Sequence, residues 1–201
     1  FTMDAGGSEN NQIFVLDPKN GSSQMLSDGQ SRNGGPLWEK NGSRIAYQST
    51  RRNGQSNDVW MMDSKNIDSA EMILESPDGT WWGPSDWSKD GKKILIQNYI
   101  SITNAKAYLL DIESKKKEMI LGSDSTESYN AILSFDRSQK GVFFLTNEFG
   151  EFNQLAHKDL ATNKISILTK DIPWDIGGFA ISTDYKREAF TVNEGDMGTT
   201  Y

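Results

Sequence analysis

The chain has 201 residues, of which 28 are acidic and 21 basic, so its net charge is −7, and the basic cluster at 114–117 is too short to indicate a nucleic-acid binder. It contains no cysteine, which excludes disulfides and thiolate metal sites. The longest apolar runs, such as residues 142–145, have the length of a strand and fall far below the roughly 18 residues that a membrane span needs.

Taken in chain order, the sequence alternates short apolar strands with turns. The first complete unit predicts four strands, at 35–38, 44–49, 58–63 and 70–75. The first two strands are joined by Asn41-Gly42, and the next unit has Asp90-Gly91 at the same place; both pairs are strong signals for tight hairpins. A helical period of 3.6 residues has no sustained support.

Two markers repeat along the chain. A large apolar residue before the hairpin turn recurs at spacings of 49, 48 and 46 residues, at Trp38, Trp87, Phe135 and Ile181. An aspartate that ends an apolar strand keeps nearly the same period, at Asp17, Asp63, Asp111 and Asp159. Because two independent markers share one period, we interpret the sequence as a true internal repeat.

Four short antiparallel strands in every 46–49 residues predict an all-β fold, namely a β-propeller of about four blades. We expect one partial propeller over residues 1–201, with repeats at approximately 1–46, 47–95, 96–143 and 144–189, and with 190–201 opening the next blade. A β-sandwich would not explain a repeat of whole four-strand units. Phe1 aligns with Phe190, so we expect part of a larger propeller, or a unit that pairs with itself.

The repeats resemble known families. The segments "SRNGGPLWEKNGSRIAYQSTRRNG" (31–54) and "DVWMMD" (58–63) resemble TolB-like propeller repeats. The segments "WWGPSDWSKDGKKILIQNYIS" (81–101) and "EFNQLAHKDLATNKISILTKDIPWDIGGFAISTDYKREAFTVNEG" (151–195) resemble the N-terminal propeller of serine peptidases of the prolyl oligopeptidase family. The likeness spans essentially the whole chain.

That resemblance implies a propeller that covers the active site of an α/β-hydrolase domain and limits access to small peptides. The chain departs from the family there, because it has no G-x-S-x-G nucleophile elbow and only one histidine, His157. We therefore expect no catalytic residue, no cofactor and no metal site in this chain, and a hydrolase domain of the parent protein or a peptide or protein ligand as its partner. The alternatives are a TolB-like binding scaffold and, with least support, an enzyme that uses paired carboxylates. Gln139 and Tyr185, which stand where better repeats have glycine, predict less regular blades.

Propeller geometry places the loops between second and third strands, and those between blades, on one face. Aromatic and arginine side chains, typical of binding surfaces, are predicted there. The candidate partner-facing residues are Arg32, Asn33, Arg51, Arg52, Trp81, Trp82, Tyr99, Tyr129, Asn147, Glu148, Trp174 and Asp175. The alternative is that the tryptophans fill space between blades and the arginines lie in solvated loops.

The remaining conspicuous residues have structural interpretations. Trp38 and Trp87 share one phase of the repeat, so we expect both to make the same core contact. The four strand-ending aspartates are expected to accept hydrogen bonds from turn amides, and His157 to be a half-buried strand residue. Open strand edges at both ends predict self-association of the chain.

Overall fold

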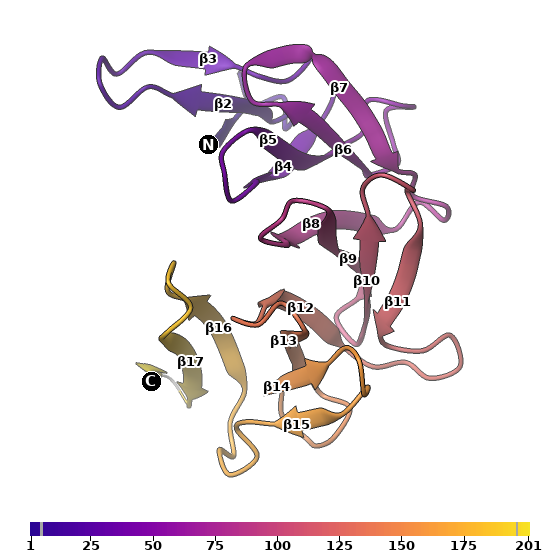
Figure 1. Cartoon of the computed structure of the whole chain (residues 1–201), viewed down its shortest axis with the longest axis vertical. Helices are drawn as coiled ribbons and strands as arrows, with labels where there is room; N and C mark the ends of the chain where they lie inside the picture. The colour runs from indigo at the N-terminus through magenta and orange to yellow at the C-terminus, as the bar shows by residue number, and fades with distance from the viewer. Residues whose placement is uncertain (5, 196) are drawn as a thin grey trace.

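The chain folds as a row of β-sheets bent into an open arc (Figure 1). In this computed structural model, residues 1–4, 6–195 and 197–201 are described, and they form 18 strands in five antiparallel sheets. Within those ranges no helix is long and apolar enough to cross a membrane. The expected all-β propeller fold is confirmed.

The three middle sheets are four-stranded meanders, whose strands we call a to d in chain order. The first consists of β4 (Asn33–Trp38), β5 (Arg44–Ser49), β6 (Asp58–Asp63) and β7 (Asn66–Leu74). The second consists of β8 (Trp81–Trp87), β9 (Lys93–Ser101), β10 (Asn104–Asp111) and β11 (Lys117–Leu121). The third consists of β12 (Asn130–Phe135), β13 (Gly141–Thr146), β14 (Gln154–Asp159) and β15 (Ile165–Ile167). Each strand a lies toward the concave side of the arc (Figure 1).

The two end sheets have three strands each. The first contains β1 (Thr2–Met3), β2 (Gln12–Leu16) and β3 (Ser23–Met25), and the last contains β16 (Ile176–Ile181), β17 (Glu188–Glu194) and β18 (Met197–Thr200). Phe1 stacks on Phe14 at 5.4 Å between ring centroids, and Phe190 stacks on Tyr201 at 5.6 Å. Phe1 and Phe190, which the repeat aligns, therefore have the same place in strand b, so the first sheet corresponds to strands b to d and the last to strands a to c.

The three middle sheets run from a strand a to a strand d, so they are offset from the sequence repeats. The repeat 47–95, for example, starts within β5 and ends within β9. We number the sheets one to five along the chain.

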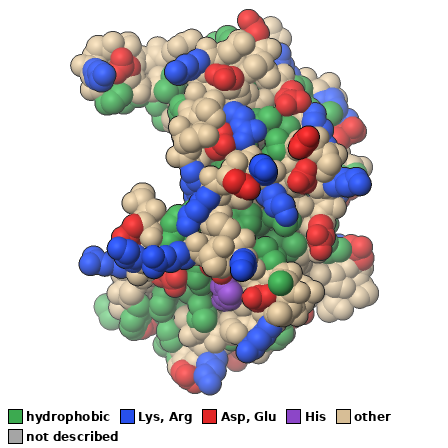
Figure 2. Space-filling view, viewed as in Figure 1, with side chains coloured by type: hydrophobic (Ala, Val, Ile, Leu, Met, Phe, Trp, Pro, Cys, Tyr) green, Lys and Arg blue, Asp and Glu red, His purple; other side chains and the backbone are tan. Residues whose placement is uncertain are grey.

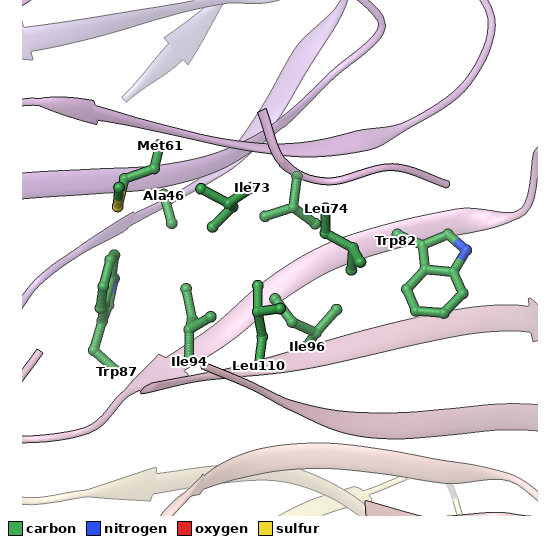
Figure 3. Packing of buried hydrophobic residues seen from close by; sticks show 10 residues of the cluster. Ala46, Met61, Ile73, Leu74, Trp82, Trp87, Ile94, Ile96 and Leu110 are labelled. Carbon is green, nitrogen blue, oxygen red and sulfur yellow. The ribbon is translucent and has the colours of Figure 1, made fainter. Parts of the chain in front are cut away.

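Apolar side chains between neighbouring sheets form the core. Between sheets two and three, strands β5 to β7 meet β8 to β10, as Figure 3 shows. The buried residues of this layer are Ala46, Val59, Met61, Ile73, Leu74, Trp82, Trp87, Ile94, Ile96 and Leu110. A second layer with Leu95, Phe135 and Phe144 joins sheets three and four. These apolar layers position the loops at the strand ends.

Trp38 and Trp87 do not make the same contact, contrary to the sequence expectation. Trp87 is fully buried and donates a hydrogen bond from Nε1 to the Leu37 carbonyl of the preceding sheet, at 3.1 Å. Trp38 is 44% exposed. The physical reason is that this tryptophan packs on strand a of the sheet before its own, and sheet one has no strand in that position among the described residues.

The strand-ending aspartates act as turn caps, as expected. Their Oδ1 atoms accept hydrogen bonds from backbone N–H groups two or three residues later, which satisfies amides that no strand partner reaches. The bonds are Lys19 to Asp17 at 2.8 Å, Lys65 to Asp63 at 2.8 Å, Ser114 to Asp111 at 2.9 Å, and Thr162 to Asp159 at 2.8 Å.

Candidate functional site: an aromatic cavity between two blades

The loops at one end of the sheets bring three of the predicted aromatic residues together. A cavity of about 510 Å³ opens there between sheets three and four, lined by Trp81, Gln97, Tyr99, Tyr129 and Ala131. Trp81 begins β8, Tyr99 lies near the end of β9, and Tyr129 precedes β12. We define the loop face as the face formed by the b–c and interblade loops. The site therefore lies at the loop face, where the a strands of two neighbouring blades begin.

Local structure holds Trp81 against the sheet. Trp81 pairs across the strands with Tyr99, and Asn98 donates a hydrogen bond from Nδ2 to the Trp81 carbonyl at 3.3 Å. A bridge to Asn57 ties the same backbone to the b–c loop of sheet two. The ring lies over Gly83, where a β-carbon would come within 2.5 Å of it. Glycine at 83 therefore lets the indole lie close to the sheet.

Gln97 forms a polar floor whose hydrogen-bonding capacity is already used. Its Nε2 donates to the carbonyl of Lys106 at 2.9 Å and to that of Asn130 at 3.1 Å. Its Oε1 accepts from the Ile132 N–H at 2.8 Å. Gln97 thus ties sheet three to sheet four. The surface that the cavity offers to a ligand consists of the aromatic faces and the Ala131 methyl group.

The cavity carries no charge at neutral pH. Burial, with a smaller effect from the neighbouring Tyr99 hydroxyl, raises the pKa of Tyr129, so its phenol stays protonated. The Tyr129 loop is fixed by Asn147, whose Oδ1 accepts from the Tyr129 N–H at 2.9 Å. An uncharged aromatic cavity of this size is suited to an apolar, ring-shaped or branched group.

Trp81 and Trp82 are adjacent in the chain, but their side chains point to opposite faces of the sheet. Successive side chains of a strand point to opposite faces, so Trp82 turns toward sheet two and is only 2% exposed, while Trp81 turns toward sheet four. Asn33 is buried as well. The side chains of Trp82 and Asn33 are therefore buried, and for Trp82 this agrees with the alternative that it fills space between blades.

The two candidate loop arginines make local contacts. Arg52 donates to the buried carboxylate of Asp58 at 2.8 and 3.0 Å, which explains its position without a ligand. Arg51 lies 5.3 Å above the Trp60 ring and has Asp28 at 3.9 Å. Both guanidinium groups belong to sheet two and its loops, and neither lines the aromatic cavity.

The other candidates lie around the loop face, apart from the cavity lining. Asp175 accepts a hydrogen bond from the Asn153 N–H at 2.7 Å and so caps a loop. Arg32, Glu148 and Trp174 are exposed. Sequence reasoning missed Gln97 and Ala131. Their signal was their place in the repeat, on strands b and a beside the aromatic residues.

His157 is a half-buried residue of β14, as expected. Its Nε2 lies 3.0 Å from Asp136 Oδ2. Burial raises the pKa of Asp136, but the hydrogen bonds with His157, Ser138 and the Gly141 backbone together outweigh burial and leave the pKa below its ordinary value. Within the described ranges, no group of three or more histidine, aspartate or glutamate residues is arranged to hold a metal ion.

Comparison with protein families identifies the family of this chain. Residues 1–173 match the family described as prolyl oligopeptidase, N-terminal beta-propeller domain. The chain belongs to this family. No curated protein sequence matches the propeller domain.

Solved structures share the fold of this prolyl oligopeptidase-type propeller. TolB from Acinetobacter baumannii has a TM-score of 0.77 at 17% identity, covering 97% of this chain and 46% of that one. A puromycin-hydrolyzing peptidase from Mycobacterium tuberculosis has a TM-score of 0.73 at 10% identity, covering 100% and 36%. A putative TolB from Agrobacterium tumefaciens has a TM-score of 0.72 at 15% identity, covering 95% and 66%. The propeller described here thus spans about half or less of two of these proteins.

Proposed function

We propose that this propeller domain docks peptide substrate for a serine peptidase whose hydrolase domain lies outside this chain. The observation that carries the proposal is the aromatic cavity of Trp81, Tyr99 and Tyr129, open on the loop face. Family membership supports a peptidase context. On this proposal, the cavity holds one apolar side chain of the peptide and so orients the peptide near a catalytic triad supplied elsewhere.

The lining of the aromatic cavity indicates which side chain of a peptide it would bind. Gln97 has its donors and acceptor engaged within the protein, so a polar group of a ligand would gain no hydrogen bond from it. The aromatic faces and Ala131 offer only apolar contact. Burying a side chain the size of Leu or Phe there contributes about 1.5–3 kcal/mol. Such a contact favours peptides with one large apolar residue and is too weak to trap the product.

Replacement of single aromatic residues tests the proposal. We expect Trp81→Ala or Tyr99→Ala to weaken binding of a blocked tripeptide with a central Phe by roughly five- to tenfold. Trp174→Ala is the matched control, because Trp174 is an exposed tryptophan outside the cavity lining. Binding can be followed by titration calorimetry on the 201-residue chain. Equal binding by Trp81→Ala and the unchanged chain would contradict the role of the cavity.

The second candidate function is a protein-binding scaffold without peptidase activity. The likeness to TolB, with a TM-score of 0.77, favours it, although at 17% identity this likeness establishes the fold alone. On this alternative, the cavity receives a side chain of a folded partner, and short blocked peptides do not bind. Hydrolysis of chromogenic dipeptide amides by this chain alone would contradict both candidates, because each assigns it a non-catalytic role.

A further inference from the structure

The opposite face of the sheets carries a concentration of positive charge. The four a–b turns, at 39–44, 88–93, 136–141 and 182–187, contain nine basic and four acidic residues, hence a net charge of +5. The whole chain has a net charge of −7. The basic residues are Lys40, Arg44, Lys89, Lys92, Lys93, Arg137, Lys140, Lys186 and Arg187. Figure 2 shows Lys and Arg side chains along the concave side of the arc, where the a strands lie.

Three of these turns meet around one aromatic ring. Lys89 Nζ lies 4.2 Å from the centroid of the Tyr185 ring, and Lys40 Nζ lies 5.6 Å from it. Lys40, Lys89 and Tyr185 come from sheets two, three and five. They line a cavity of about 350 Å³ together with Ser182, Thr183 and Ile181. The cavity therefore lies among the a–b turns, at the end of the strands away from Trp81.

Tyr185 occupies a strained position that places its ring there. Its φ is +57°, in the region where the equivalent turns of sheets two and three have Gly42 and Gly91. A non-glycine residue costs roughly 1–2 kcal/mol in this conformation. Because the repeat has Tyr185 here in place of glycine, this turn has a side chain that reaches two other turns.

The two lysines differ in how their charge is balanced. Lys40 is paired with the Asp86 carboxylate at 2.7 Å. Lys89 Nζ donates to a neutral group, the Arg137 carbonyl, at 2.9 Å, and has no carboxylate within 4.0 Å in the described part of the chain. An ammonium group has three donors. Lys89 therefore presents a positive charge without a counter-charge, and donors free for a ligand.

We propose that the cavity of Lys40, Lys89 and Tyr185 binds a carboxylate anion, with Lys89 as its main contact. The net charge of +5 on the surrounding turns attracts an anion toward this cavity. The lining includes two lysines and no arginine, so the anion would be held by ammonium point charges rather than by a bidentate arginine fork. The carboxylate could belong to an acidic peptide or to a small dicarboxylic acid.

This site is independent of the proposed peptide-docking cavity. Trp81 begins β8, whereas Lys89 follows its end at Trp87. A strand rises about 3.3 Å per residue, so the two sites are separated by roughly 20 Å. Loss of one site should leave binding at the other unchanged. Trp81→Ala, for example, should retain carboxylate binding, which makes failure of either proposal distinguishable from failure of the other.

The test uses fluorescein-labelled tetra-glutamate and the 201-residue chain in low salt, followed by fluorescence anisotropy. We expect saturable binding that tetra-glutamine does not show and that added salt weakens. Lys89→Gln should lower the affinity at least fivefold. Lys92→Gln, which removes the same charge from the same exposed turn but outside this cavity, should lower it less than twofold. Lys89→Arg, which keeps the charge, should bind within about twofold of the unchanged chain.

Two results would overturn the proposal: absence of tetra-glutamate binding, or equal losses in Lys89→Gln and Lys92→Gln, which would indicate a diffuse field rather than a site. Circular dichroism of each variant checks that the sheets are intact. Competition with glutarate then identifies the source of the carboxylate. Displacement by glutarate supports a small dicarboxylic acid as ligand, and tetra-glutamate binding that glutarate does not displace supports an acidic peptide.

Discussion

Gly91 lies directly against the carboxylate of Glu39 from the preceding sheet, which leaves no room for a β-carbon at residue 91. Arg44 holds that carboxylate at 2.7 and 2.9 Å and also donates to the Gly91 carbonyl at 2.6 Å. In the next sheet the residue equivalent to Glu39 is the shorter Ser88. In sheet four, Gln139 takes the place of the glycine, and its Oε1 accepts from the Lys89 N–H of sheet three at 2.8 Å. Each turn is therefore matched to the sheet before it.

Replacement of the two equivalent glycines separates backbone strain from lack of space. Gly42 and Gly91 both have positive φ, but a β-carbon at Gly42 would meet nothing within 4 Å. We expect Gly42→Ala to lower the free energy of unfolding by about 1 kcal/mol, from backbone strain alone. Gly91→Ala should lower it by about 2 kcal/mol more, because the Glu39 carboxylate must move. Urea unfolding measures both, and equal losses would contradict the steric explanation.

Asp86 connects three sheets, and its removal should affect all of them. Its carboxylate accepts from Lys40 Nζ of sheet two at 2.7 Å and from the Phe135 N–H of sheet four at 3.0 Å. We expect Asp86→Ala to lower the free energy of unfolding by about 3 kcal/mol, since a nearly buried hydrogen-bonded charge is lost. Asp63→Ala, which removes an exposed turn cap, should cost under about 1 kcal/mol. Chemical unfolding curves that show similar losses for both variants would argue against a bridging role.

The Glu39–Arg44 pair predicts a pH dependence of stability. The hydrogen bond from Arg44 lowers the pKa of Glu39 from its ordinary value of 4.5, against the opposing effect of burial. A lowered pKa contributes stability that is present above about pH 4.5 and is lost as the pH falls through the folded-state value. Glu39→Gln should therefore cost about 2 kcal/mol at pH 7, and the difference from the unchanged chain should shrink below pH 4. The control is Glu113→Gln on an exposed turn, and a difference that persists unchanged at pH 3 would contradict the prediction.

The two equivalent tryptophans should differ in their contribution to stability. Trp87 is fully buried, whereas Trp38 is 44% exposed. We expect Trp87→Ala to lower the free energy of unfolding by about 3–5 kcal/mol, as for other buried large residues. Trp38→Ala should cost less than about 1 kcal/mol. Thermal or urea unfolding tests the contrast, and comparable losses would mean that Trp38 has a core contact in solution.

Local chemistry explains why much of the fold could be predicted from the sequence. Asn41-Gly42 and Asp90-Gly91 specify their hairpins by their own backbone preferences, and the strand-ending aspartates such as Asp63 cap their own turns. These signals depend only on near neighbours in the chain. They therefore revealed the strands, the antiparallel pairing within each sheet and the period of the repeat.

The burial of individual residues depends instead on the neighbouring sheet. Trp38 and Trp87 are equivalent within their own sheets and differ because different strands precede them. Strand alternation separates Trp81 from Trp82, and it could have been applied to the sequence. Gln139 and Tyr185 looked like irregular turns, although each provides a contact to another sheet. Which loop-face residues share a cavity follows only from the placement of sheets three and four.

The exposed Trp38 face predicts self-association of the 201-residue chain. Trp38 is a large apolar residue on the first strand of sheet two, beside a sheet that has no strand a among the described residues. Uncovered apolar surface next to an unpaired strand edge favours pairing with another chain. We expect light scattering to show a dimer or larger species, and Trp38→Lys to shift it toward the monomer by placing a charge in the contact. Trp174→Lys is the matched control, because Trp174 is 42% exposed but lies on the loop face. A chain that is monomeric before any substitution, or equal shifts in the two variants, would show that this face does not mediate association.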